Sequence, residues 1–229
     1  MVGNNPVNAF DILGLIKRAD IESDRTVYSR GAGWIDLAHV RATTEGGVQI
    51  MRAMLEYERD PGITASVVRT AVQAKGKSRF SSVILFNYAG RPSRNDRIEI
   101  VLGIELQFQN YWETYQGGIL GGNFVSKSSF SVEDLPSDFL GVMIATGEFS
   151  SMADMLSQMG ALTKRESLCV WDRGTGPLQN HSYKPILWKW KNNGNEFGSV
   201  HSVFSRYTPR QAPNGFIFWS NDGSFNPFN

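Results

Sequence analysis

Asp36 and His39 form the pair of side chains best suited to chemistry in this sequence. They belong to the segment Arg30–Arg41, in which Gly31 and Gly33 permit a tight turn and Asp36 is suited to cap a helix. A helix that begins at this aspartate places the two side chains three residues apart on one face. A carboxylate beside an imidazole fixes the tautomer of the ring and raises its basicity, as a general base or a metal ligand requires. The alternative interpretation is an N-cap aspartate next to a histidine with a structural role.

This pair predicts a hydrolase in which His39 is the general base and Asp36 orients its ring. In this hypothesis Arg30 or Arg41 binds an anionic group of the substrate, and Glu113 is a second acid–base group. The residue types leave the substrate and any cofactor open.

Two histidines and a glycine-rich segment are further candidates for binding sites. His181 and His201 lie twenty residues apart without cysteine partners, which is no recognisable zinc spacing, so the sequence predicts no metal site. The glycine-rich segment 117–122 lacks the Gly-Lys-Ser/Thr ending of a phosphate-binding loop and is interpreted as a hinge or lid.

Two segments together resemble a bacterial domain family of unknown function that is known mainly from predicted lipoproteins. Residues 30–41 read RGAGWIDLAHVR, and residues 128–141 read SSFSVEDLPSDFLG. The family carries Gly-Phe-Ile-Asp-x-Ala-His-x-Arg and Ser-Phe-Ser-Pro-Glu-Asp-Leu-x-Ser-Asn-x-x-Gly in the same order. It also places a His-Glu pair before the second motif, where this chain has residues 110–115 and Glu113 is the nearest acid. The resemblance marks candidate positions without naming a reaction.

The first fifteen residues resemble the conserved end of Rhs repeat cores, where Asp-Pro-x-Gly-Leu precedes a self-cleavage point. The matching residues are Asp11, Gly14 and Leu15, with Ile12 where proline is usual. The resemblance implies that residues 1–15 are the end of an Rhs core and that residues 16–229 are a released effector domain. It also gives the aspartate of the motif a role in aspartyl-protease-like self-cleavage, together with a second acid in the upstream core.

The Rhs resemblance implies an antibacterial toxin that is delivered into a target cell by a contact-dependent machine such as a type VI secretion system. Its implied partners are the Rhs cocoon before release and a cognate immunity protein. The sequence shows no classical signal peptide, which agrees with this route. The alternative to a hydrolase is a non-enzymatic toxin that perturbs membranes or binds an essential target. A nuclease is a weaker alternative, as is an ADP-ribosyltransferase built on Arg30, a Ser-Ser pair at 128–129 and Glu148.

Composition restricts these alternatives. The 23 basic and 22 acidic residues nearly cancel, so the chain carries no strong nucleic-acid signal. No run approaches the roughly 18 apolar residues that a membrane-spanning helix requires, so no transmembrane segment is predicted. The single cysteine, Cys169, forms no internal disulfide and is interpreted as a small core thiol in a buried strand.

The elements that position these residues are predicted from periodicity. The expected fold is α+β, a single domain in which a helical N-terminal half packs on a β-rich C-terminal half. Helices are expected over residues 47–59, 94–116, 131–145 and 150–159, and strands over 63–72 and 80–86, which pair. Further strands are expected over 168–171, 186–190, 200–207 and 216–219.

Overall fold

The computed structural model describes residues 16–60, 66–72, 79–85, 91–119, 131–174, 180–187, 198–210 and 216–220. Side chains are described in these ranges except in 66–72, 79–85, 111–119 and 216–220. The helices are α1 (Arg18–Glu22), α2 (Leu37–Arg59), α3 (Arg94–Ile119), α4 (Asp134–Ala145), α5 (Met152–Gln158), α6 (Lys164–Asp172) and α7 (Val203–Arg206). The strands are β1 (Thr26–Ser29), β2 (Gly33–Asp36), β3 (Ser66–Val72), β4 (Arg79–Leu85) and β5 (Phe216–Ser220).

A short antiparallel hairpin, β1–β2, leads directly into α2. Tyr28 pairs with Trp34 across the hairpin, and their rings meet edge to face with centroids 5.0 Å apart. Gly33 closes the turn with φ 68°, a conformation that other L-residues rarely adopt. A Cβ at Gly33 would also lie 2.7 Å from the carbonyl oxygen of Ile186, so only glycine fits under that segment.

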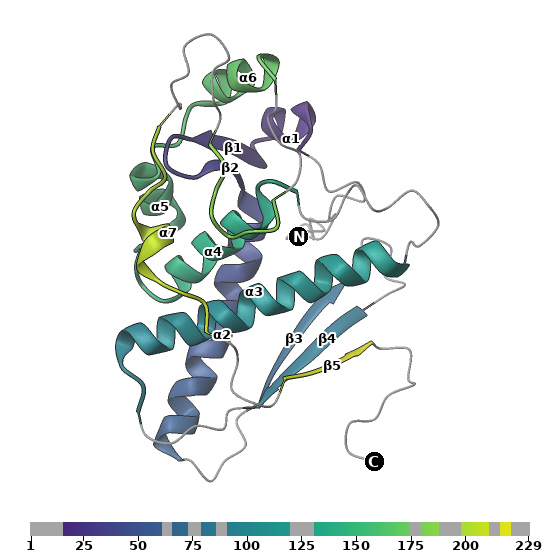
Figure 1. Ribbon diagram of the computed structural model, residues 1–229, viewed down its shortest axis with the longest axis vertical. Helices are drawn as coiled ribbons and strands as arrows, with labels where there is room; N and C mark the ends of the chain where they lie inside the picture. Colours follow the sequence, from purple (N-terminus) through teal and green to yellow (C-terminus); the bar gives the residue numbers. More distant parts are fainter. Residues whose placement is uncertain are drawn as a thin grey trace, which may run out of the picture.

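Helices α2 and α4 pack side by side, with α3 crossing them (Figure 1). Gly141 of α4 lies against the start of α2, because a Cβ there would be 2.6 Å from the carbonyl oxygen of Val40. Further along the same contact, a Cβ at Gly47 of α2 would lie 2.7 Å from the Cβ of Ala145. The two helices therefore run in the same direction, and their N-termini lie next to each other.

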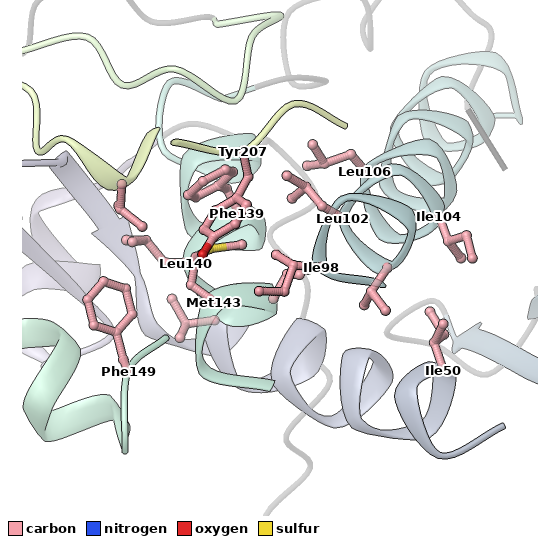
Figure 2. Close-up of a cluster of buried hydrophobic side chains, with 14 of the residues drawn as sticks. Ile50, Ile98, Leu102, Ile104, Leu106, Phe139, Leu140, Met143, Phe149 and Tyr207 are labelled. Carbon is pink, nitrogen blue, oxygen red and sulfur yellow. The ribbon is translucent and has the colours of Figure 1, made fainter. Parts of the chain in front are cut away.

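The main hydrophobic core lies where α2, α3 and α4 meet, and the segment around α7 closes one side of it. Figure 2 shows Ile98 and Leu102 of α3 facing Phe139 and Met143 of α4. Phe139 and Leu140 are fully buried, and the ring of Phe139 stacks on Phe204 at 4.7 Å between centroids. This core fixes α4 against α2.

Strands β3, β4 and β5 form an antiparallel sheet in that order, and β3 contacts α2 (Figure 1). Val68 pairs with Val83, and Ser82 pairs with Phe218. The predicted pairing of the segments 63–72 and 80–86 is confirmed for residues 66–72 and 79–85, while residues 63–65 and 86 lie outside the described residues.

The segment 198–210 is tied to the helices by ion pairs. Glu148, which follows α4, contacts Arg94 of α3 at 2.7 Å and Arg206 of α7 at 2.9 Å. Arg210 contacts Glu99 of α3 at 2.7 Å through its side chain, and its backbone N–H donates to the carbonyl of the same residue at 3.0 Å. The chain in this region is thus held across α3 without being part of a sheet.

The prediction of an α+β fold with a β-rich C-terminal half is wrong, because the protein is mostly helical. The described part of the C-terminal half forms α4 to α7, and β5 is the one strand named there. Residues 168–171 belong to α6, and 200–207 contain α7. Residues 186–187 are irregular, and 188–190 lie outside the described residues. Short apolar runs occur equally well in a strand and on one face of a helix. The apolar runs of the C-terminal half therefore did not distinguish the two kinds of element.

Two smaller expectations change with this correction. Cys169 is exposed on α6, not buried in a strand. The predicted helix over 131–145 begins at Asp134, so Pro136 lies in its first turn, where a missing N–H costs no intrahelical hydrogen bond. The predicted helices over 94–116 and 150–159 are confirmed as α3 and α5, with ends that differ by a few residues.

Candidate functional site

Asp36 is the N-cap of α2. Its Oδ1 accepts the backbone N–H groups of Ala38 at 2.6 Å and of His39 at 3.2 Å. Its Oδ2 accepts from the guanidinium of Arg25, with Nε at 3.2 Å and the nearest terminal nitrogen at 3.1 Å. The side chain therefore serves as a helix cap and an ion-pair partner, as in the alternative interpretation of the sequence pair.

The imidazole of His39 lies between two carboxylates of α4. Its Nδ1 is 3.1 Å from Oδ1 of Asp138, and its Nε2 is 3.6 Å from Oδ1 of Asp134. The His39 and Asp134 side chains are each 9% exposed, while that of Asp138 is 1% exposed. The ring is thus nearly buried, but its polar atoms face acids and not apolar side chains.

A threonine holds the carboxylate that meets the ring. Thr43, one turn after His39 on α2, donates its hydroxyl to Oδ1 of Asp138 at 2.7 Å. The other oxygen, Oδ2, is buried and has no hydrogen-bond partner among the described residues. The geometry of Asp138 relative to the imidazole is therefore determined through a single oxygen.

The start of α4 contributes Asp134 and one further acid, the N-cap residue Glu133. The hydroxyl of Ser131 donates to Oε2 of Glu133, and the backbone N–H of Ser131 donates to Oδ2 of Asp134 at 2.8 Å. Ser137 joins this turn to the hairpin, because its hydroxyl accepts the N–H of Asp36 at 2.9 Å and donates to the carbonyl of Glu133 at 2.6 Å. We refer to Asp36, His39, Glu133, Asp134 and Asp138 as the acid–histidine cluster.

The cluster forms where two helix N-termini meet, which explains why acids gather there. The exposed N–H groups of a first helical turn give that end a partial positive charge, which stabilises carboxylates. An uncompensated imidazolium in the first turn of α2 would be unfavourable for the same reason. His39 is held in that position by the surrounding acids.

Burial and charge shift two protonation equilibria in the cluster. Burial alone lowers the pKa of His39, but the charges of Asp138 and Asp134 outweigh it, and the pKa lies well above the ordinary value of 6.5. For Glu133, burial is the largest influence and raises the pKa from 4.5 to about 8, against the hydrogen bond from Ser131. Both pKa shifts favour the protonated form, an imidazolium at His39 and a neutral carboxylic acid at Glu133, and each of these forms can donate a proton.

The structure brings Asp36 and His39 together and assigns the other three residues of the sequence hypothesis to separate elements. Arg30 lies at the turn of the β1–β2 hairpin, and Arg41 lies on α2; both are exposed. Glu113 lies on α3, where the structure describes the backbone only. Their proposed roles as substrate-binding and acid–base groups stay predictions.

Asp11, Gly14 and Leu15, which the Rhs resemblance implies are a self-cleavage motif, lie outside the described residues. Within the described ranges, no group of three or more His, Cys, Asp or Glu side chains is arranged to hold a metal ion. In the same ranges, no helix combines the length and the apolar character that crossing a bilayer demands.

Sequence reasoning missed Asp138 and Thr43 as neighbours of the imidazole. Glu133 and Asp134 lie in the expected helix over 131–145, but periodicity along that helix does not indicate what they face. The second motif of the lipoprotein resemblance contains Glu133, Asp134 and Asp138, and its pairing with the first motif was the available signal. Comparison of the chain with protein-family models, with curated proteins and with solved structures gave no significant match.

Proposed function

We propose that this chain is the cargo of an Rhs-type antibacterial toxin and that its acid–histidine cluster catalyses a hydrolysis by general acid–base chemistry. The observation that carries the enzymatic part is the placement of His39 between Asp134 and Asp138. A buried ring with a carboxylate at each nitrogen and a strongly shifted pKa is typical of catalytic sites.

Hydrolysis needs a base that takes a proton from water and an acid that protonates the leaving group. Asp134 is the base in this proposal, because its side chain, like that of His39, keeps an exposed fraction of 9%, whereas that of Asp138 keeps 1%. The imidazolium donates the Nε2 proton to the leaving group and regains a proton from Asp134 through one water, because 3.6 Å between Nε2 and Oδ1 is too long for direct transfer. Asp138 orients the ring through Nδ1 and stabilises its charge.

This assignment revises the roles inferred from the sequence. His39 rests in its protonated form, because its pKa lies well above 6.5, and therefore acts first as the acid. The orienting carboxylate is that of Asp138, while Asp36 caps the helix. Glu133 is protonated at neutral pH and is a second proton donor next to the same helix ends.

The delivery part of the proposal depends on the resemblance of residues 1–15 to the end of Rhs cores. It includes release after Leu15, export by a contact-dependent machine such as a type VI system, and neutralisation by an immunity protein. The near balance of 23 basic and 22 acidic residues supports a substrate other than nucleic acid.

Expression of the chain in bacteria, with and without an export signal, tests this function. We expect growth arrest with the native sequence, and loss of arrest in His39→Gln and Asp138→Asn at equal soluble protein levels. Glu45→Gln, which removes an exposed carboxylate from the same helix, is the matched control and keeps full toxicity. Full toxicity of His39→Gln would overturn the enzymatic site. Dye leakage from liposomes with that variant would then identify the non-enzymatic alternative.

A further inference from the structure

Oδ1 of Asp138 receives two donors, the hydroxyl of Thr43 at 2.7 Å and the imidazole of His39 at 3.1 Å. We propose that Thr43 is a positioning residue of the acid–histidine cluster, whose hydroxyl fixes the carboxylate so that this oxygen meets Nδ1 of the ring. The inference deepens the proposed function and depends on the acid–base role of His39.

The position of Thr43 is suited to this task. It lies four residues after His39 on α2, so both side chains project from the same face of the helix towards α4. Its side chain is fully buried, and its hydroxyl crosses to a carboxylate that is 95 residues away in sequence. A buried hydroxyl bonded to a charged oxygen is a stronger and more directional contact than apolar packing alone.

The surroundings of the second carboxylate oxygen of Asp138 explain why the hydroxyl of Thr43 is needed to fix the carboxylate. Among the described residues, nothing bonds to the buried Oδ2, so the hydrogen bonds that fix rotation of the carboxylate are those at Oδ1. Without the hydroxyl of Thr43, the imidazole contact alone sets that rotation. The carboxylate is then freer to rotate, and the Nδ1 hydrogen bond becomes less well aligned. The bond weakens as a result, because hydrogen-bond strength falls steeply with angle.

The neighbouring threonine provides a matched control. Thr44 also joins α2 to α4, because its hydroxyl donates to the carbonyl of Val40 at 2.7 Å and contacts that of Gly141 at 3.2 Å. It bonds to backbone carbonyls and not to the cluster. Thr44→Val therefore makes the same chemical change on the same helix without altering Asp138.

Proton NMR of the full 229-residue chain tests the inference. The Nδ1 proton of His39, assigned by its absence in His39→Gln, is expected far downfield and protected from exchange in the native protein. Thr43→Val, which keeps the shape and removes the donor, should move this resonance upfield and speed its exchange. Thr43→Ser restores the donor and should restore the resonance, and Thr44→Val should leave it unchanged. If Thr43→Val does not fold, Thr43→Ala is measured in its place.

The same variants are compared for growth arrest. Thr43→Val should lose up to about 100-fold in toxicity, the cost of displacing a reacting group by about 1 Å. An unchanged resonance in Thr43→Val, an equal change in Thr44→Val, or a native protein without the downfield proton would each overturn the inference. Failure of the proposed function is a separate result, because it appears as full toxicity of His39→Gln whatever the resonance does.

Discussion

Nδ1 of His39 lies 3.1 Å from Oδ1 of Asp138, although 99 residues separate the two in sequence. The contact joins the first turn of α2 to α4, and it depends on the close approach of these helices at Gly141. The acid nearest in sequence, Asp36, instead caps α2 and pairs with Arg25. The surroundings of the imidazole are thus set by tertiary packing and not by its neighbours in sequence.

Asp138→Asn and Asp36→Asn should have different effects on His39. Asp138 makes the largest contribution that raises the pKa of the ring, whereas that of Asp36 is the smallest of those identified. Asparagine is also a good N-cap, so Asp36→Asn preserves α2. We expect Asp138→Asn to lower the pKa of His39 towards 6.5 and to abolish toxicity, while Asp36→Asn shifts it less. NMR titration of the His39 imidazole measures its pKa in both variants. Equal pKa shifts in the two variants would contradict the role of Asp138 as the main charge partner of the ring.

The stability of the protein should fall as pH rises through neutrality. His39 has a folded pKa well above the unfolded value of 6.5, so its stabilisation is complete below 6.5 and is lost as pH rises through the folded pKa. Glu133 has a pKa of about 8 in the folded state, against 4.5 in the unfolded chain. Between these pH values the folded state keeps a proton that the unfolded state has released. Its effect also decreases stability with rising pH, between about 4.5 and 8, by at most about 1.4 kcal/mol per pH unit.

Glu133→Gln isolates this effect. The amide mimics the protonated glutamate and still accepts the hydroxyl of Ser131, so the variant should unfold at a higher urea concentration than the native protein at pH 8.5. At pH 4 the two midpoints should converge. The exposed Glu45→Gln should follow the native curve at both pH values. A Glu133→Gln protein that is less stable at pH 8.5 would show that the glutamate is ionised in the folded state.

Local signals in the sequence predicted the elements that carry strong periodicity or clear breaks. The apolar spacing of residues 94–116 predicts α3, and two β-branched runs separated by a turn predict the β3–β4 pair. The segment 168–171 was predicted wrongly. Thr163 and Glu166 form a capping box that starts α6, and this signal was overlooked in favour of the apolar run.

The candidate site could be predicted only in part for a similar reason. Spacing along one helix relates Asp36 to His39, but it contains no information about α4, which approaches from a distant part of the chain. The order of the two resembling motifs marked the right segments, and Gly141 in the second motif is the residue that permits their contact. Which carboxylate reaches the ring depends on helix packing, and one sequence does not determine that.

Glu148→Gln should loosen the segment around α7. Burial opposes the ionised form of Glu148, but bonds from Tyr207, Arg94 and Arg206 outweigh it and lower its pKa. Removal of the charge weakens hydrogen bonds to charged groups, so the amide of Arg210, which donates to Glu99, should exchange at least about tenfold faster. Hydrogen exchange followed by mass spectrometry measures this. Glu166→Gln, at the distant cap of α6, should leave the segment unchanged, and equal exchange in both variants would contradict the role of Glu148.

Gly141→Ala and Gly47→Ala test whether the α2–α4 contact positions the site. Each added Cβ meets the facing helix at less than 3 Å, so each should destabilise the protein by about 1–3 kcal/mol. For a protein of this size that corresponds to a fall in Tm of roughly 2–4 °C per kcal/mol, measurable by calorimetry. Of the two glycines, only Gly141 lies next to the threonine that holds Asp138, because its Cβ would be 2.8 Å from the Cβ of Thr43. We therefore expect Gly141→Ala to displace Asp138 and reduce toxicity at a temperature where both variants are folded, while Gly47→Ala stays toxic. Equal toxicity of the two folded variants would mean that the helix contact supports stability alone.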